Sequence, residues 1–220
     1  MFKTLSFKLM SVLSIVALLS ACAQPVKRPD YTAFKKSQPR SILVLPPINE
    51  TSDVAATYGV LSQMTLPLAE SGYYVVPVAV MDETFKQNGL TNAAEIQGTS
   101  PAKLREIFGA DAALYSKVSQ YGTVYRILAS ATVVSASAKL VDLRTGDVLW
   151  QGRASASSDE GGNNGGGLIG MLVVAAVKQI ANTLMDQSHD VAAFTSSRLL
   201  SAGPPSGLLY GPHSPKYGTD

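Results

Sequence analysis

A strand, a helix and a second strand follow one another within residues 41–80, and this pattern limits the fold more than any other part of the sequence. Residues 41–45 (SILVL) form a continuous apolar run that two prolines end, as is typical of a strand buried on both faces. Residues 54–70 carry apolar side chains at helical spacing. Residues 73–80 (YYVVPVAV) predict a second buried strand, in which Pro77 removes one hydrogen-bond donor. A unit of this kind has parallel strands and a right-handed crossover, which indicates an α/β fold.

The remainder of the chain predicts further strands and helices that complete a single domain. The stretches 125–143 and 148–157 are two long strands, and Gly146 between them favours a tight hairpin. Small residues at 135–137 predict a bulge or turn in the first of these strands. The other expected elements are helices over 81–88, 101–108 and 191–200, a half-turn at 93–98 and a strand over 113–121. The sequence therefore predicts an α/β (α+β) domain over residues 41–200, with a mixed β-sheet of about five strands flanked by helices.

An unusually apolar helix is predicted from residue 168 to about residue 187, after a glycine-rich loop. Its first half is apolar on every side, and such a helix is buried in protein or in lipid. The apolar stretch is too short to span a bilayer, so we favour a buried core or an oligomer interface over membrane insertion. The residues expected at the oligomer interface are Leu168, Met171, Leu172 and Val174. From residue 201 to residue 220 the chain is rich in Gly and Pro, which predicts a disordered tail.

The N-terminus has the three parts of a secretion signal. A basic start with Lys3 and Lys8 precedes an apolar run over residues 9–19, and small residues then lead to Cys22. Leu-Ser-Ala-Cys resembles the bacterial lipobox, in which the signal is cut before the cysteine and the cysteine receives lipid, palmitate included. We therefore expect residues 1–21 to be a lipoprotein signal peptide. The alternative is an ordinary secretion signal followed by a chance cysteine.

The segment after the signal predicts a tether to a membrane. Residues 22–40 are polar, rich in proline and mostly basic, as is typical of a flexible linker close to anionic head groups. Ala23 stands where an Asp tends to retain lipoproteins at the inner membrane of Gram-negative bacteria, so we expect the outer membrane, with the domain facing the periplasm or the cell surface.

Charge and cysteine content exclude several classes of function. Removing Lys3 and Lys8 with the signal from the 18 basic residues leaves 16, which equals the 16 acidic residues. A neutral chain argues against nucleic acid as a partner, because phosphate binding needs a basic face. With Cys22 acylated, no thiol remains for a disulfide, a nucleophile or a cysteine metal site. The fold must then be stabilised by packing alone.

No set of residues in the sequence predicts catalysis. The only histidines, His189 and His213, lie far apart in the sequence without clustered carboxylates, which is poor evidence for a metal site. No G-x-S-x-G motif is present to support a serine nucleophile. We expect neither an enzyme nor a bound cofactor.

One loop could form a small polar site. It follows the first strand, at the end of the sheet where α/β proteins often bind ligands. Its polar residues are Asn49, Glu50, Ser52 and Asp53. The simpler interpretation is that these side chains stabilise a turn and cap the next helix, with Asp53 as the cap, and we prefer it.

Three stretches of the sequence resemble one group of envelope lipoproteins. SILVLPPINETSD, GADAALYSKVSQYG and KLVDLRTGDVLWQG are similar to the first strand, the middle strand and the late hairpin of lipoproteins with a TolB-amino-terminal-like domain, such as the curli-secretion lipoprotein. Residues 39–200 resemble more closely the outer-membrane lipoproteins of unknown function typified by a neisserial surface antigen. The resemblance implies a mixed sheet flanked by helices, anchoring in the outer membrane and work within an envelope assembly.

The leading functional hypothesis is therefore an outer-membrane lipoprotein that acts by protein–protein contacts in cell-envelope assembly or transport. The partners expected are the outer membrane through the N-terminal lipid, other envelope lipoproteins and a second copy of the chain, with a dimer as the first expectation. The alternative is a periplasmic or surface lipoprotein that binds a small ligand without catalysis.

Overall fold

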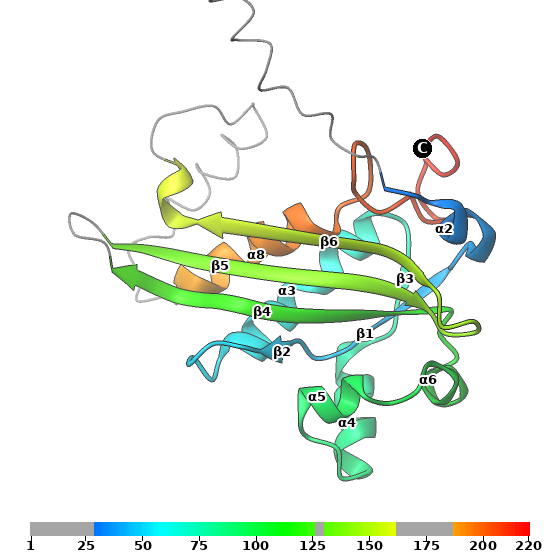
Figure 1. The fold of residues 1–220 in the computed structure, drawn as a ribbon, viewed down its shortest axis with the longest axis horizontal. Coiled ribbons are helices and arrows are strands. Elements are labelled where there is room, and N and C mark those ends of the chain that lie inside the picture. Colours follow the sequence, from blue (N-terminus) through cyan, green and yellow to red (C-terminus); the bar gives the residue numbers. More distant parts are fainter. Residues whose placement is uncertain (1–28, 126–129, 162–186) are drawn as a thin grey trace, which may run out of the picture.

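The fold is built on one mixed sheet of six strands. The computed structural model describes residues 29–125, 130–161 and 187–220. The strands follow the order β3-β1-β4-β5-β6, and β2 pairs with β4 beside β1 (Figure 1). Their bounds are β1 Ser41–Val44, β2 Ile48–Asn49, β3 Tyr74–Val75, β4 Ala112–Tyr125, β5 Ser130–Asp142 and β6 Val148–Ser157.

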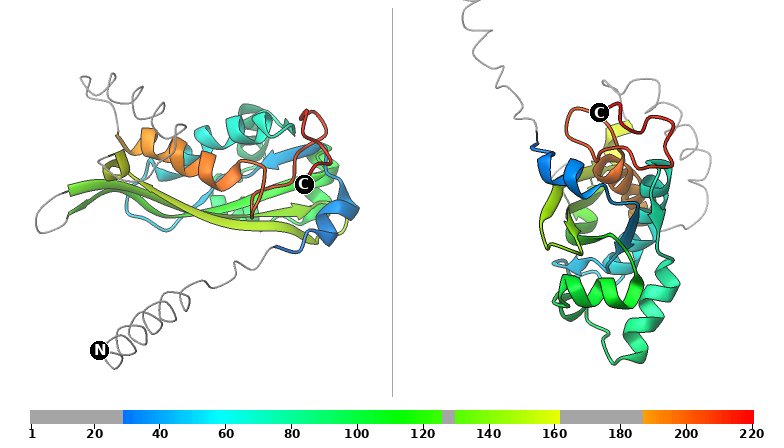
Figure 2. Two further views of the ribbon diagram at one scale, coloured as in Figure 1. Left: turned by 90° about the horizontal axis from the view of Figure 1, so that it is seen from above. Right: turned by 90° about the vertical axis from the view of Figure 1, so that its right-hand side faces the viewer.

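Helices complete a mixed α/β domain, which confirms the predicted fold class. Their bounds are α2 Thr32–Ser37, α3 Ala56–Glu70, α4 Val78–Gln87, α5 Ala93–Gln97, α6 Pro101–Phe108 and α8 Gln187–Leu200, with a 3-10 turn at Ser158–Gly161. Helices α3 and α8 contact each other and lie on the same face of the sheet (Figure 2). Within the described ranges, no helix is both long enough and apolar enough to cross a membrane.

The parallel half of the sheet confirms the predicted strand–helix–strand unit. β1 pairs in parallel with β3 through Ser41 and Tyr74, and with β4 on its other side. All four residues from Ile42 to Leu45 are at most 1% exposed, so both faces of β1 are covered. The helix between the strands, α3, buries Val60, Leu61, Met64 and Leu68 at helical spacing.

The predicted strand over residues 73–80 is wrong after its third residue. β3 ends at Val75, and α4 begins at Val78 with Pro77 before it as the N-cap. The backbone N–H groups of Val80 and Met81 donate to the Pro77 carbonyl, which starts the helix. Proline cannot donate to a strand ladder but fits a helix start, so Pro77 ends the strand rather than interrupting it.

The antiparallel half confirms the predicted late hairpin. β5 and β6 are joined by residues 143–147, and Leu140 pairs with Trp150. The predicted strand 125–143 is divided differently, because Tyr125 ends β4 and pairs with Ser130 at the start of β5. The irregularity expected in the small residues of β5 lies opposite them, in β4, where the register shifts between Val118 and Gln120.

Both ends of the domain differ from expectation, since they are packed rather than free. Residues 32–37 of the expected tether form α2, whose Phe34 is 3% exposed. In the expected disordered tail, Leu208 is fully buried, and the Tyr73 hydroxyl donates to the Leu209 carbonyl at 2.5 Å. The Tyr31 hydroxyl donates to the Gly207 carbonyl, also at 2.5 Å, so the tail also packs on the segment that leads into α2.

Glycines explain why a tail rich in Gly and Pro is ordered. The Gly211 N–H donates to the Ser71 carbonyl at 2.8 Å, and the His213 N–H donates to the Gly72 carbonyl at 3.0 Å. A Cβ added at Gly211 would lie 2.5 Å from the Gly72 carbonyl oxygen. Two backbones can approach this closely only where side chains are absent.

The hairpin between β5 and β6 is stabilised by a buried carboxylate, that of Asp142. Its side chain is 2% exposed and accepts hydrogen bonds from the Ser37 hydroxyl at 2.5 Å and from the backbone N–H groups of Arg144 and Thr145 at 2.6 and 3.1 Å. Burial alone would raise the pKa of Asp142, but these hydrogen bonds together outweigh burial and hold the pKa below its usual value. Asp142 therefore ties α2 to the hairpin in its ionised form.

We expect Asp142→Asn to lower the free energy of unfolding by about 1–3 kcal/mol at pH 7, because an amide cannot accept the same set of bonds. A carboxyl group whose pKa is lowered by folding stabilises the folded state above its unfolded pKa of about 3.9, and this contribution is lost as the pH falls further. Urea unfolding of the wild type and of Asp142→Asn should therefore show that their difference in free energy of unfolding becomes smaller from pH 7 to pH 3. The exposed Asp147→Asn is the control, and a difference that stays constant with pH would contradict this account.

Gly211→Ala should detach the tail from the turn after α3. The added Cβ would overlap the Gly72 carbonyl, which the backbone can relieve only by moving the two segments apart. We expect faster hydrogen exchange at the amides of residues 211 and 213 and a lower melting temperature. Gly89→Ala is a matched control, because a Cβ there meets nothing within 4 Å and costs only the left-handed backbone strain of about 1–2 kcal/mol. Equal rates of hydrogen exchange at the amide of residue 213 in both variants would show that the added Cβ at residue 211 does not separate the tail from Gly72.

Candidate functional site

The loop after β1 is organised by one of the four predicted site residues, Asn49. Its side-chain oxygen accepts from the N–H and the hydroxyl of Thr51, both at 2.8 Å. Its amide nitrogen donates to the Asp53 carbonyl at 2.7 Å. Asn49 thus closes the loop on itself and also ends β2, which pairs with Lys117 and Val118 of β4.

The side chains of the other three predicted residues do not converge with that of Asn49. Glu50 forms an ion pair with Lys117 at 2.8 Å, and both side chains are about half exposed. Asp53 accepts from the Ala55 N–H at 2.8 Å, within the turn that precedes α3. Ser52 is exposed to solvent. These contacts fit the simpler interpretation of the sequence, in which the polar side chains stabilise a turn. The predicted cap residue differs, because the N-cap of α3 is Ala55 rather than Asp53.

Asn49 nevertheless lines a pocket of about 380 Å³ between the end of β1, the start of α3 and α5. Its walls mix apolar and polar groups, among them Pro46, Ile48, Thr57, Tyr58 and Asn92. Asn92 caps α5 by accepting from the Ala94 N–H at 2.8 Å. Asn92 was not predicted as a site residue, although an Asn just before a short helical stretch is a recognisable cap signal. A cavity of this size and composition can hold a small ligand.

Tyr58 at the rim of this pocket belongs to an exposed cluster of polar groups. Its hydroxyl donates to an Asp82 carboxylate oxygen at 3.2 Å, and Lys86 pairs with Asp82 at 2.5 Å. Partial burial raises the pKa of Tyr58, and the charge of Asp82 adds to this effect. The phenol is therefore neutral at physiological pH, and the cluster is a surface hydrogen-bond network between α3 and α4.

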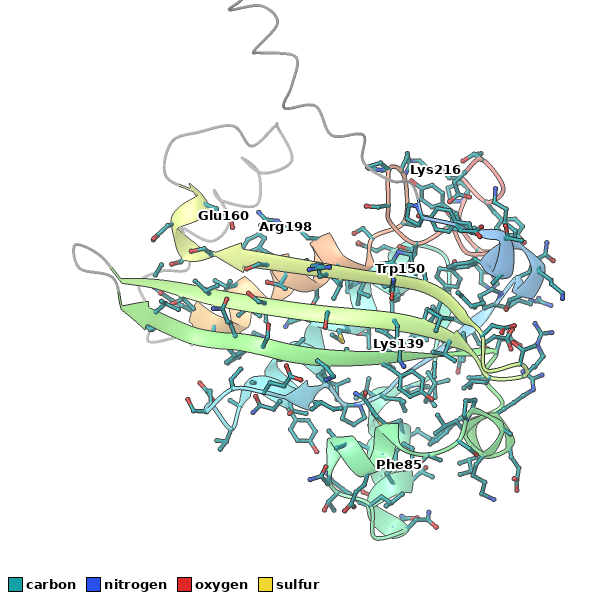
Figure 3. The ribbon with its side chains drawn as sticks, viewed as in Figure 1. Phe85, Lys139, Trp150, Glu160, Arg198 and Lys216 are labelled. Carbon is teal, nitrogen blue, oxygen red and sulfur yellow. The ribbon has the colours of Figure 1, made fainter. Side chains whose placement is uncertain are left out.

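A second and larger depression, of about 1020 Å³, lies on the face of β4, β5 and β6 opposite α3 and α8. We call it the open face and define it by its exposed side chains. These are Lys117, Ser119, Ser137, Lys139, Gln151, Arg153 and Ser155. Figure 3 labels Lys139, which lies on the open face, and Trp150, which is 4% exposed and packs on the other side of the sheet. This surface was not predicted from the sequence, although polar residues alternate along all three strands.

Gln97 of α5 joins the two depressions. Its side-chain nitrogen donates to the carbonyl groups of Pro46 and Ser116, at 2.8 and 2.9 Å. It also lines the open face, while its neighbour Ile96 lines the smaller pocket. These bonds fix α5 against the edge formed by β2 and β4.

The two histidines have different surroundings in the fold. His189 of α8 lies 2.7 Å from the Gln63 side chain of α3, whereas His213 belongs to the packed tail. Among the described residues, no group of three or more His, Cys, Asp and Glu side chains is placed to hold a metal ion. The predicted lipid site at Cys22 and the predicted interface at Leu168, Met171, Leu172 and Val174 lie outside the described residues.

Comparison with known proteins identifies relatives of the whole domain. The family model described as "Putative lipoprotein GNA1162-like" matches residues 29–213. A lipoprotein of Neisseria meningitidis serogroup B (NMB1124/NMB1162) is 55% identical over 203 residues, which cover 91% of this chain and 93% of the relative. This confirms the resemblance to neisserial lipoproteins that the sequence motifs indicate.

Solved structures include a relative of the same kind. The crystal structure of lipoprotein GNA1162 from N. meningitidis is 56% identical and matches with a TM-score of 0.53, over 66% of this chain and all of that one. A PelC dodecamer from Paraburkholderia phytofirmans is 14% identical and matches with a TM-score of 0.44, over 80% of this chain and 96% of that one. The family match covers most of the chain, including α2 and part of the packed tail. The chain therefore belongs to the GNA1162-like lipoprotein family.

Proposed function

We propose that this protein is anchored in the outer membrane by lipid on Cys22 and acts there through protein–protein contacts in envelope assembly or transport, without catalysis. The observation that carries the proposal is membership of a lipoprotein family over residues 29–213, joined to the lipobox-like motif that precedes them. The family supplies the lipoprotein class, and the contact function is our inference.

The packing of the N-terminal part supports a position close to the membrane. Tyr31 is already tied to the domain through Gly207, so nine residues lead from Cys22 to Tyr31. A chain of that length spans at most about 32 Å when fully extended. A domain held at this distance meets other membrane-anchored proteins more readily than free solutes, because tethering raises the effective concentration of neighbours at the surface.

Cross-linking in intact cells, followed by mass spectrometry, tests this proposal. We expect the wild-type protein to form cross-links to itself and to other envelope lipoproteins, and Cys22→Ala to lose them because the protein is no longer held at the membrane. The expression level of the two proteins must be matched. Recovery of the wild-type protein without any cross-linked envelope protein would refute the contact function.

The pocket beside Asn49 supports a second candidate function, the binding of a small ligand. Its volume of about 380 Å³ falls within the range of small-molecule sites, and its polar groups come from the loop and from α5. Ala94 is exposed on its wall, so Ala94→Trp would fill the pocket without disturbing the core.

Thermal-shift screening of metabolites separates this candidate from the first. A ligand at a hundredfold excess over its Kd should stabilise the wild type by about 2.7 kcal/mol and leave Ala94→Trp unchanged. The absence of any stabilising compound, or an equal shift in the variant, would argue against the pocket as a binding site.

A further inference from the structure

The open face carries charge that the protein itself leaves largely uncompensated. Side chains of one rung of a sheet lie side by side, and the register aligns Lys117, Ser137 and Arg153 across β4, β5 and β6. Lys139 follows Ser137 on the same face of β5, two residues along the strand. Three cationic side chains therefore surround the exposed hydroxyl of Ser137.

Only one of these three cations has an acidic partner in the part of the chain that the structure describes. Lys117 pairs with Glu50 at the rim of the open face. Lys139 lies 5.3 Å above the ring of Tyr115, which supplies no charge. Arg153 forms none of the observed ion pairs, and all charged residues that line the depression are basic. The open face thus has a positive potential although the mature chain is formally neutral.

The composition of the open face fits a hydrophilic ligand better than a protein. Stable protein interfaces have a core of aromatic and apolar anchors and are depleted in lysine and serine. Here the exposed groups are hydroxyls, amides and cations, and Tyr115 is 9% exposed. An acidic peptide lying on the middle of this face would also lack backbone partners there, because β5 is paired with β4 on one side and β6 on the other.

We propose that the open face of β4, β5 and β6 binds an anionic polysaccharide. The carboxylates of the polysaccharide would lie at Lys139 and Arg153, and its hydroxyl groups at the serine and glutamine side chains of the open face. This goes beyond the proposed contact function and does not depend on it. The depression, at about 1020 Å³, accommodates several sugar units rather than a single anion. A second copy of the same face does not fit it, because two positive surfaces repel each other.

The direct test is binding of oligogalacturonate to the full-length protein in non-ionic detergent, measured by calorimetry at 50 mM salt. We expect saturable binding to the wild type and at least tenfold weaker binding to the double variant Lys139→Ser/Arg153→Ser. Binding should also weaken with added salt, because the charges are exposed. Lys86→Ser/Lys103→Ser removes the same charge from α4 and α6 and is the matched control, which should bind like the wild type.

Three outcomes would overturn the proposal. One is no binding of oligogalacturonate to the wild type, and another is equal weakening in both double variants, which would indicate a general charge effect. The third is binding of polyglutamate of the same charge as tightly as oligogalacturonate, which would assign the face to an acidic peptide. All four substituted positions are exposed, and matching melting temperatures would verify that the variants fold.

Discussion

β4 is the strand on which the rest of the molecule depends, because its two edges meet different kinds of partner. On one edge β1 and β2 pair with it in parallel, and on the other β5 pairs with it antiparallel over the whole length from Ala112 to Tyr125. Leu114 and Val118 on its inner side are fully buried. Hydrogen bonds along both edges join the strand–helix–strand unit and the late hairpin into one sheet, so neither half could keep its register without β4.

The two faces of the antiparallel half have opposite character. Toward α3 and α8 the rung of Leu114, Leu140 and Trp150 is buried, and Gly152 lets the ring of Trp150 lie close to the strand. The next residues along each strand point the other way and are mostly polar. An antiparallel sheet can leave one face exposed to solvent. In this protein the solvent-exposed face is the open face, which also carries excess positive charge.

Much of the fold could be predicted from the sequence because local patterns agree with it. Residues 41–45, the helix over 101–108 and the strand over 148–157 follow from apolar runs, caps and alternation. Other features depend on contacts between distant segments. Pro77 becomes a helix start rather than a strand residue, and the Gly- and Pro-rich tail finds a partner in Gly72. Such a contact depends on the space available in the folded molecule, which composition does not reveal.

The candidate sites were harder to predict than the fold. The loop from Asn49 to Asp53 was found from its position after the first strand, but Asp53 serves the turn, Glu50 forms an ion pair and Ser52 is exposed to solvent. The open face could not be predicted from any one strand, because each of the three strands contributes only two or three exposed polar residues to it. Lys117, Lys139 and Arg153 become neighbours only through the register of three strands, which the pattern within any one strand does not reveal.

The first and the last described segments of the chain, α2 and the tail, pack together at one end of the sheet. Lys35 of α2 donates to the backbone oxygen of Asp220, so α2 and the packed tail are neighbours, near the first residues of β4 (Figure 1). β4 has 14 residues, and at about 3.4 Å per residue it extends roughly 45 Å from there to its pairing with β5 at Tyr125. The paired strands β4 and β5 therefore extend away from the end of the sheet where α2 and the tail pack. A partner that contacts the far end of β4 and β5 therefore lies at a fixed distance from α2.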